Sequence, residues 1–182
     1  MLDRQAALSH LRKHIHKENL IKHMLACEAC MEHLAKNLGE DAESWALAGL
    51  LHDIDYEMTT DCPNKHGIKA LELLPCDQLS EDILDSIQSH AGHCDRKTIM
   101  AKALYAVDPL TGLVVASVLM TPTRRLKDLS PETVLKRYKE KRFAAGACRE
   151  QIASCAEFGL SLEDFVNHCV CAMQNRAGDL GL

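Results

Sequence analysis

Apolar side chains recur at three- and four-residue intervals between Leu20 and Leu38, and this spacing restricts the fold more than any other feature of the chain. Such a period places the apolar groups on one face of an α-helix. Gly39 follows, and glycine readily adopts the left-handed conformation that ends a helix. The sequence therefore predicts a long amphipathic helix that ends at this glycine.

The composition favours helices throughout. The 182 residues include 26 Leu and 21 Ala, against 15 Val plus Ile and 4% aromatic residues. Unbranched or small apolar side chains lose little rotamer freedom in a helix. We therefore expect an all-α protein.

Residues that cap helices precede several other segments. Asp41 stands before the run 45–51, which is apolar on every side and therefore reads as a buried helix. Ser80, Ser130 and Ser161 are each followed by the acidic residues or proline typical of a first helical turn. These signals predict three further helices.

The segments between these helices are less regular. Residues 54–64 are rich in Asp and Thr and read as a loop, and Asn64 opens a short helix that stops before Pro75. Asp95 is a candidate cap for a helix that contains Ile99 and Val107, and the apolar pattern resumes through Leu119 and ends before Pro122. We expect an irregular globular bundle of seven to nine helices without a convincing strand, forming one domain over the full length of the chain.

The charge balance limits the partners. The chain has 21 Lys plus Arg and 26 Asp plus Glu, so its net charge is −5. Duplex nucleic acid is bound mainly through many cationic contacts to phosphate, so we expect no duplex partner.

Two further features concern the cellular compartment. The uncharged stretch 109–123 is shorter than the ~18 apolar residues of a membrane span, and residues 3–4 are charged where a signal peptide would be apolar. Cys27 and Cys30 form a CxxC without a second one at zinc-ribbon spacing, so we interpret them as small buried apolar residues. We expect a reduced, cytoplasmic protein with no membrane partner.

The His52-Asp53 pair follows the apolar run 45–51 directly. A carboxylate at the end of a buried helix is costly unless it is paired, hydrogen-bonded or bound to a cation. The alternative is that the helix leaves the core there and Asp53 is exposed to solvent.

Four other residues have two readings each. His23 and His90 lie on apolar helix faces, so each is either a core histidine or a metal ligand. Asp108 precedes Pro109, so it is either a ligand or the cap of a new helix. His66 lies near a helix start and is either a ligand or a surface residue. Together with the His52-Asp53 pair they form a set of four histidines and two aspartates, which suits Mn, Fe, Co, Ni or Zn without any thiolate.

The order of these residues resembles a known family. His23, then His52-Asp53, then the distant Asp108 is similar to the H…HD…D signature of the HD-domain superfamily of metal-dependent phosphohydrolases. The segment from Ala48 to Asp55 resembles the helix that ends in the HD pair, although many relatives have Gly where this chain has Asp55. His66 and His90 resemble the additional histidines of the two-metal branches.

The resemblance covers residues of about 18–120, with a helical carboxy-terminal extension over about 130–178. It implies an HD-domain-like fold with one or two divalent transition metals, Mg being an alternative. One ion would be held by His23, His52, Asp53 and Asp108. Asp53 would bridge to a second ion held by His66 and His90.

Further roles follow as hypotheses. His93 is a candidate proton donor to the leaving group, and Asp55 and Glu57 are candidates to orient the attacking water beside the catalytic Asp53. Cations can hold a substrate phosphate, and the candidates are Lys65, Arg96, Lys97, Arg124 and Arg125. A solvated surface position is the alternative for each of them.

The predicted function is hydrolysis of a small phosphoester or phosphoanhydride, with a nucleotide as the expected substrate. The nucleotide is implied by the resemblance and not by the residues. The alternatives are an HD-type di-iron oxygenase, a metal-containing ligand-sensing module without turnover, and a helical interaction protein with incidental histidines.

Overall fold

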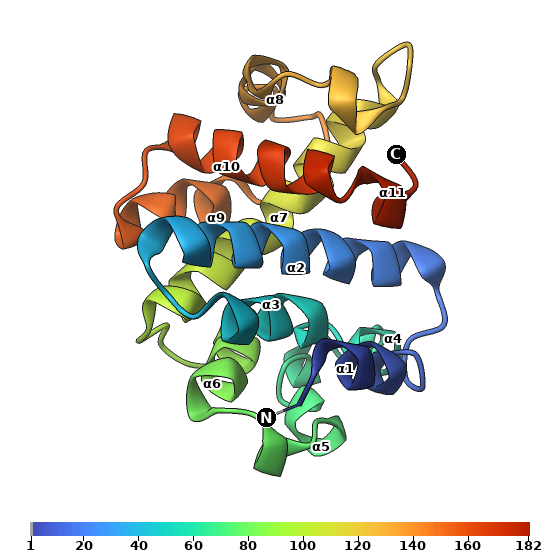
Figure 1. Ribbon diagram of the computed structural model, residues 1–182, viewed down its shortest axis with the longest axis vertical. Coiled ribbons are helices and arrows are strands. Elements are labelled where there is room, and N and C mark those ends of the chain that lie inside the picture. Colours follow the sequence, from blue (N-terminus) through green and yellow to red (C-terminus); the bar gives the residue numbers. More distant parts are fainter. Residues whose placement is uncertain (1) are drawn as a thin grey trace.

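The computed structural model describes residues 2–182, which are helical with no strand among them (Figure 1). Seven helices have eight residues or more: α1 (Arg4–Leu11), α2 (Glu18–Leu38), α3 (Ala42–Leu51), α6 (Glu81–His90), α7 (Ile99–Leu119), α8 (Pro131–Tyr138) and α10 (Leu162–Asn175). Four are shorter: α4 (Tyr56–Thr59), α5 (Ala70–Leu73), α9 (Arg149–Ala153) and α11 (Ala177–Leu180). The predicted all-α fold is confirmed.

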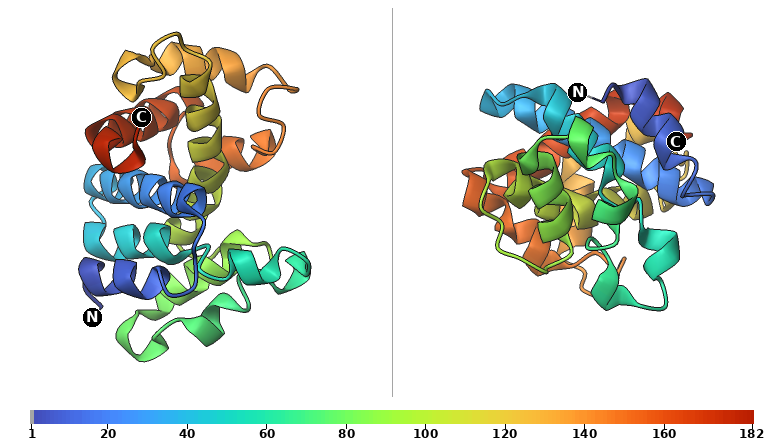
Figure 2. Two further views of the ribbon diagram at one scale, coloured as in Figure 1. Left: turned by 90° about the vertical axis from the view of Figure 1, so that its right-hand side faces the viewer. Right: turned by 90° about the horizontal axis from the view of Figure 1, so that it is seen from below.

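The long helices stack along the longest axis of the molecule. In Figure 2, α10, α2, α3 and α1 follow one another in a column, with α7 running beside them. Helix α2 is therefore central and contacts α3, α7 and α10. One contiguous apolar core extends from α1 to α11, so the carboxy-terminal helices share the core of the residues before them.

The helix boundaries follow the capping residues. Asp41, Ser80, Ser130 and Ser161 each accept a hydrogen bond from a backbone N–H of the first turn of α3, α6, α8 and α10. Gly39 ends α2 with φ 76°, in the left-handed region. These predicted starts and the predicted stop are confirmed.

A close contact between α2 and α3 fixes the position of the His-Asp pair. A Cβ added to Gly49 would lie 2.8 Å from backbone atoms of Cys27 and Glu28, so only glycine allows the helices to approach this closely. The thiols of Cys27 and Cys30 are buried, as predicted. Because α3 lies directly against α2, its last turn lies beside His23.

Three predicted boundaries are wrong. Helix α7 begins after Thr98, not Asp95. It continues through Pro109, so Asp108 does not cap a new helix, and it ends at Leu119, as the apolar pattern predicts. The proline removes one helical hydrogen bond, but both flanking segments bury their apolar faces in the core, and this packing holds the helix together.

The other two errors lie in the segment 54–75. The predicted loop contains the one-turn helix α4, and Asn64 lies in a 3₁₀ turn, whereas α5 begins at Ala70. The chain does leave the helix before Pro75, as expected.

Helix α7 is long and apolar enough to cross a membrane by length and composition. In the structure, however, 56% of its most apolar window is buried inside the protein. It also carries Asp108 on a face turned towards α2 and α3, since that carboxylate lies within 3.1 Å of His23 Nε2 and 3.8 Å of His52 Nε2. Helix α7 is thus a core helix of the bundle.

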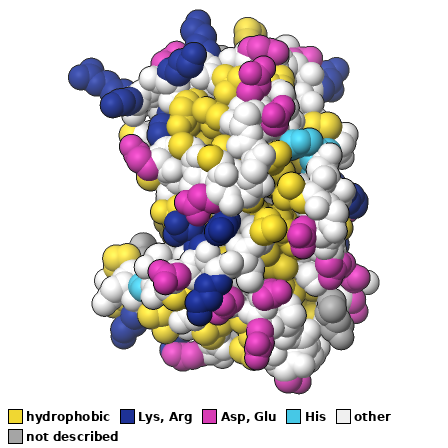
Figure 3. Space-filling view, turned by 90° about the vertical axis from the view of Figure 1, so that its left-hand side faces the viewer, with side chains coloured by type: hydrophobic (Ala, Val, Ile, Leu, Met, Phe, Trp, Pro, Cys, Tyr) yellow, Lys and Arg dark blue, Asp and Glu magenta, His cyan; other side chains and the backbone are white. Residues whose placement is uncertain are grey.

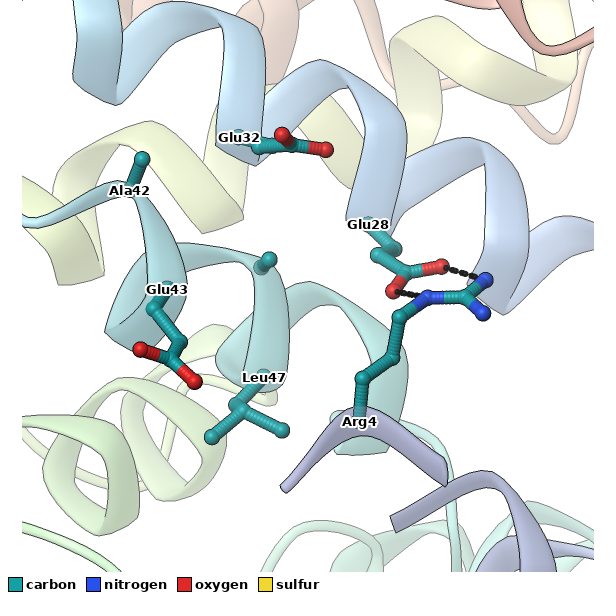
Figure 4. Close-up of a pocket in the computed structure, with 7 residues that line it drawn as sticks. Arg4, Glu28, Glu32, Ala42, Glu43 and Leu47 are labelled. Atoms are coloured by element: carbon teal, nitrogen blue, oxygen red, sulfur yellow. Dashed lines mark hydrogen bonds and ion pairs between the residues drawn. The ribbon is translucent and has the colours of Figure 1, made fainter. Parts of the chain in front are cut away.

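The amino- and carboxy-terminal segments are joined through one buried carboxylate on α2. Glu28 is 1% exposed and accepts hydrogen bonds from Arg4, which lies on α1, at 2.9 Å, and from Arg176, which precedes α11, at 3.3 Å. Figure 4 shows the Arg4 guanidinium turned towards Glu28, beside a hollow that Glu32 and Glu43 also line. This ion cluster fixes both ends of the chain to the central helix.

Candidate metal centre

Six side chains from five segments meet beside the end of α3. His52 and Asp53 follow that helix, His23 comes from the first half of α2, and Asp108 from the middle of α7. His90 is the last residue of α6, and His66 follows the 3₁₀ turn over 63–65. All six predicted metal ligands are therefore brought together.

One oxygen of Asp53 faces the first group of ligands. Its Oδ2 lies 3.6 Å from His23 Nε2 and 3.5 Å from His52 Nε2. Asp108 Oδ1 completes this side, at 3.1 Å from His23 Nε2 and 3.8 Å from His52 Nε2.

The other oxygen of Asp53 faces the second group. Its Oδ1 lies 3.2 Å from His66 Nε2 and 3.4 Å from His90 Nε2, and these two nitrogens are 3.2 Å apart. Each oxygen of a single buried carboxylate thus belongs to a different set of imidazoles.

Hydrogen bonds at Nδ1 orient the imidazoles. His52 Nδ1 donates to Gly49 O at 2.9 Å, and His90 Nδ1 donates to Ile87 O. The hydroxyl of Thr111 lies 3.1 Å from His23 Nδ1. Each Nε2 is consequently turned towards the centre, as in metal sites whose ligating histidines are held from outside the coordination sphere.

Asp55 holds the fourth imidazole and is fully buried. Its Oδ1 lies 2.9 Å from His66 Nδ1, while Oδ2 accepts from the backbone N–H of Gly67 at 2.8 Å and of Ala70 at 3.0 Å. Both oxygens are therefore used within the protein. Contrary to the hypothesis, Asp55 positions His66 instead of orienting a water molecule.

The chemistry of this donor set fits a divalent cation. His52 Nε2 is buried and makes no hydrogen bond with any of residues 2–182, which is unfavourable unless a ligand occupies its lone pair. One nitrogen of His52, one oxygen of Asp53 and one nitrogen of His90 lie within 4.8 Å of one another. Imidazole and carboxylate are ligands that suit transition metals.

The carboxylates also control the protons of the imidazoles. Burial lowers the pKa of His52, but the charges of Asp53 and Asp108 outweigh this and raise it to about 9. Burial likewise opposes protonation of His66, yet hydrogen bonds to Asp53 and Asp55 raise its pKa to about 10. The same pairs hold the pKa of Asp53 and of Asp108 below the usual range, against the effect of burial.

Cys27 adds a sulfur atom next to this centre. Its Sγ lies 3.9 Å from His23 Nε2 and belongs to a group with His23, His52 and Asp108 whose ligand atoms lie within 4.8 Å. Burial raises the pKa of the thiol, which keeps it protonated and a poor ligand. The role assigned from the sequence, a buried apolar residue, is consistent with this environment.

The centre opens into a hollow of about 410 Å³. Besides five of the six ligands, the hollow is lined by Leu20, Tyr56, Ala91 and Gln151. Sequence reasoning missed these four residues. Leu20 was visible only as part of an apolar helix stripe, and no local signal marks Gln151, which reaches the hollow from α9.

The cations proposed to hold phosphate do not line this hollow. Lys65, Lys97, Arg124 and Arg125 are exposed, and the two arginines lie beyond the end of α7, about 16 Å of helix away from Asp108 at ~1.5 Å per residue. Arg96 stacks on Tyr105 at 3.8 Å. Lys65, Lys97, Arg124 and Arg125 therefore occupy surface positions, and Arg96 makes a structural contact with Tyr105.

His93 and Glu57 also lie outside the hollow. His93 is exposed on the loop after α6. Glu57 accepts from the backbone N–H of His16 at 3.0 Å and of Lys17 at 2.7 Å, and so ties α4 to the start of α2. The structure assigns Glu57 a structural contact where the sequence suggested catalysis.

Comparison with known proteins agrees with this geometry. The family model described as HD domain matches residues 20–137. The chain is 31% identical over 138 residues to Ribonuclease Y of Bacillus pumilus (strain SAFR-032) and to that of Bacillus subtilis (strain 168). It is 28% identical over 138 residues to Ribonuclease Y of Sulfurovum sp. (strain NBC37-1).

These alignments cover 73% of this chain and 26–27% of each relative, so the chain spans about a quarter of the length of the curated relatives it matches. An all-helical scaffold that gathers histidines and aspartates in the HD order defines the class of metal-dependent phosphohydrolases. The chain belongs to the HD-domain family. The resemblance seen in the sequence is confirmed.

Proposed function

We propose that the chain hydrolyses a phosphoester or phosphoanhydride of a small nucleotide with two divalent transition metal ions. One observation carries the two-metal assignment: the two oxygens of Asp53 face different imidazole pairs. His23, His52 and Asp108 would hold one ion with Asp53 Oδ2, and His66 and His90 the other with Asp53 Oδ1. Such ions lower the pKa of the attacking water and neutralise charge on phosphoryl oxygens.

The chain itself supplies orientation and shape. Hydrogen bonds to Gly49, Ile87 and Asp55 keep the imidazoles aimed inward before any substrate arrives. Preorganised groups of this kind need no rearrangement during the reaction.

Gln151 is a neutral hydrogen-bonding residue of the hollow. Its side-chain amide makes no hydrogen bond with residues 2–182, so it is free to donate to a phosphoryl oxygen. We propose that it replaces Lys65, Arg96, Arg124 and Arg125 as the group that positions the phosphate.

Two observations bear on the size of the substrate. On the face shown in Figure 3, Lys and Arg side chains alternate with Asp and Glu and form no continuous basic band. The net charge of the whole chain is −5. A long polyanion is bound through many cationic contacts, so both observations support a small substrate. The cytoplasmic location expected from the sequence suits such a substrate and remains part of the proposal.

A second candidate function is hydrolysis of a phosphodiester bond in single-stranded RNA. The relatives named Ribonuclease Y favour it, and the shared segment contains the HD residues. Each relative is about four times as long as the aligned segment.

The test is release of inorganic phosphate from a panel of nucleotides and simple phosphoesters, with Mn²⁺, Mg²⁺, Co²⁺ or Ni²⁺ and a single-stranded oligoribonucleotide in parallel. We expect turnover of nucleotides to exceed cleavage of the oligoribonucleotide. Preferential cleavage of RNA would replace the first candidate with the second. O₂ uptake by an iron-loaded sample without phosphate release would instead indicate the di-iron oxygenase, and metal without any turnover the sensing module.

A further inference from the structure

A second hollow adjoins the one at the metal centre. The two share Leu20 and Tyr56 as a common wall, and beyond it the second hollow is lined by Lys17, Glu18 and Asn19 at the start of α2. Their volumes are about 410 and 450 Å³, each within the ~300–1,000 Å³ of small-molecule sites. Together they form one groove that runs from Asp53 past Tyr56, and we call it the Tyr56 groove.

Tyr56 presents an aromatic ring to this groove. Its ring stands at 90° to the imidazole of His66, with centroids 5.6 Å apart, so a metal-centre residue supports it from one side. It is nevertheless 43% exposed. An accessible aromatic ring beside a phosphate-processing centre is the kind of surface on which a nucleobase stacks.

The walls of the Tyr56 groove are fixed to each other. Glu57, the next residue after Tyr56, accepts the backbone N–H groups of His16 and Lys17, so α4 and the start of α2 are joined. Thr59 donates to Asp55 O at 2.9 Å and closes the single turn of α4. The ring and the beginning of α2 therefore keep their spacing without a ligand, which lowers the entropic cost of binding.

The charges along the groove suit an anionic ligand. Glu18 is paired with Arg12 at 2.8 Å, which offsets its negative charge. Lys17 and Asn19 are exposed and offer an ammonium group and an amide. These groups can contact a sugar hydroxyl or a neighbouring phosphate, whereas Leu20 and Tyr56 contact the base.

We propose that the Tyr56 groove binds the nucleoside attached to the phosphate at the metal centre. This inference rests on the proposed phosphohydrolase function and assigns a binding surface to the nucleoside part of its substrate. Stacking accepts every base because each has a π-face, so the groove selects a nucleoside over other alcohols without strong base preference.

The test compares adenosine monophosphate with glycerol phosphate, which carries the same ester without a ring. In Tyr56→Ala, the ratio of kcat/KM for the two substrates should fall about tenfold, equivalent to about 1.4 kcal/mol, mainly through KM for the nucleotide. Tyr56→Phe keeps the ring and should restore the ratio. Met58→Ala is the matched control, since Met58 lies on the same short helix, is 55% exposed and lines neither hollow.

Calorimetric binding of adenosine monophosphate separates this inference from the catalytic one. Weaker binding in Tyr56→Ala supports the groove even if the protein hydrolyses neither substrate, an outcome that would overturn the proposed function alone. An unchanged ratio together with unchanged affinity would overturn the groove and leave the phosphohydrolase function standing. A short oligoribonucleotide in the same assays distinguishes a free nucleotide from a chain end, because the loss should be largest on the preferred form.

Discussion

Two buried carboxylates on adjacent segments have opposite surroundings. Glu28 is 1% exposed and is held by the guanidinium groups of Arg4 and Arg176, whereas Asp53 is 5% exposed and is faced by four imidazoles. A guanidinium keeps its proton at every ordinary pH, so Glu28 is permanently neutralised. Imidazoles can release their protons and offer lone pairs to a metal. The comparison distinguishes a structural anchor from a centre that can exchange protons for cations.

The largest expected effect is the loss of the centre itself. Asp53→Asn keeps the volume but removes the charge and one of the two anionic oxygens. Turnover should fall by about 1,000-fold or more, since the group acts on both sides of the centre. Phosphate release and elemental analysis on the same preparation measure this.

Lys65→Ala and Arg125→Ala are the controls for that experiment. Both residues are exposed, and neither lines the metal-centre hollow, so both variants should retain wild-type rates. Turnover by Asp53→Asn at the rate of these controls would show that the carboxylate has no part in the reaction.

The next largest effect is expected on the side of the centre formed by Asp53 Oδ1, His66 and His90. His66→Ala and His90→Ala should each remove one metal equivalent while leaving the other, because each removes a ligand from the Asp53 Oδ1 side only. Metal content by elemental analysis should fall from about two equivalents to about one.

A double variant of another histidine pair controls for a nonspecific loss of metal. His33 Nε2 and His168 Nδ1 lie 3.2 Å apart between α2 and α10 without a carboxylate between them. Ala at both positions should leave the metal content unchanged. Full metal content in the His66 and His90 variants would reduce the centre to a single ion.

Substitution of Glu28, the structural anchor, should lower the stability of the protein and leave its metal content unchanged. Glu28→Gln loses the charge-assisted hydrogen bonds from Arg4 and Arg176, which we expect to cost about 2 kcal/mol. For a chain of this length that corresponds to a fall in Tm of about 4–8 °C. Glu32→Gln, one turn along α2, removes more exposed pairs and should shift Tm by less. Metal loss in Glu28→Gln at low temperature would contradict the separation of the two sites.

The imidazoles around Asp53 should also make the stability of the protein depend on pH. In protein stripped of metal by a chelator, His52 and His66 have pKa values of about 9 and about 10 when folded, above the value near 6.5 of an unfolded chain. The stability that they contribute is complete below pH 6.5 and is lost as the pH rises through 9 and 10. Tm of the stripped protein should therefore fall over this window.

Reloading with Mn²⁺ is the counterpart measurement. A cation replaces the protons on the imidazoles, so the difference in Tm between loaded and stripped protein should grow from pH 6.5 to 9. A difference that stays constant with pH would show that the imidazoles do not bind the metal.

The smallest expected effect is at Gln151. Gln151→Ala removes one neutral hydrogen-bond donor from the hollow, and kcat/KM should fall by about tenfold, in line with the ~0.5–1.5 kcal/mol of such a bond. Gln151→Glu should be worse, because it places a negative charge next to the phosphate. Steady-state kinetics on one nucleotide distinguish the two variants. Rates equal to that of the wild type in both would show that Gln151 does not contact the phosphate.

The inward placement of four ligands was predictable because its signals are local, whereas the full ligand set, with His66 and Asp108, came from the resemblance to the HD-domain family. His52 and Asp53 follow a helix that is apolar on all sides, and His23 and His90 lie on apolar helix faces, so their position in the core is encoded in a few turns of sequence. The helix starts at Asp41 and Ser80 were predictable for the same reason.

The residues that surround the ligands were not predictable in this way. Asp55 was expected to face water, but its two oxygens are used by backbone groups 12 and 15 residues away and by His66. Gln151 reaches the hollow through the packing of α9 against α7. Asp108 and Pro109 resembled a helix start, and only the burial of both halves of α7 keeps the helix continuous. These outcomes depend on tertiary packing, which spacing along the chain does not reveal.

The most direct test of the account is the number of metal ions held per chain. Protein should be stripped with a chelator, reloaded with Mn²⁺, freed of unbound metal and measured by elemental analysis next to Asp53→Asn. We expect about two equivalents in the wild type and a large loss in the variant. A wild-type protein that cannot be reloaded, or an Asp53→Asn variant with the same content, would contradict it.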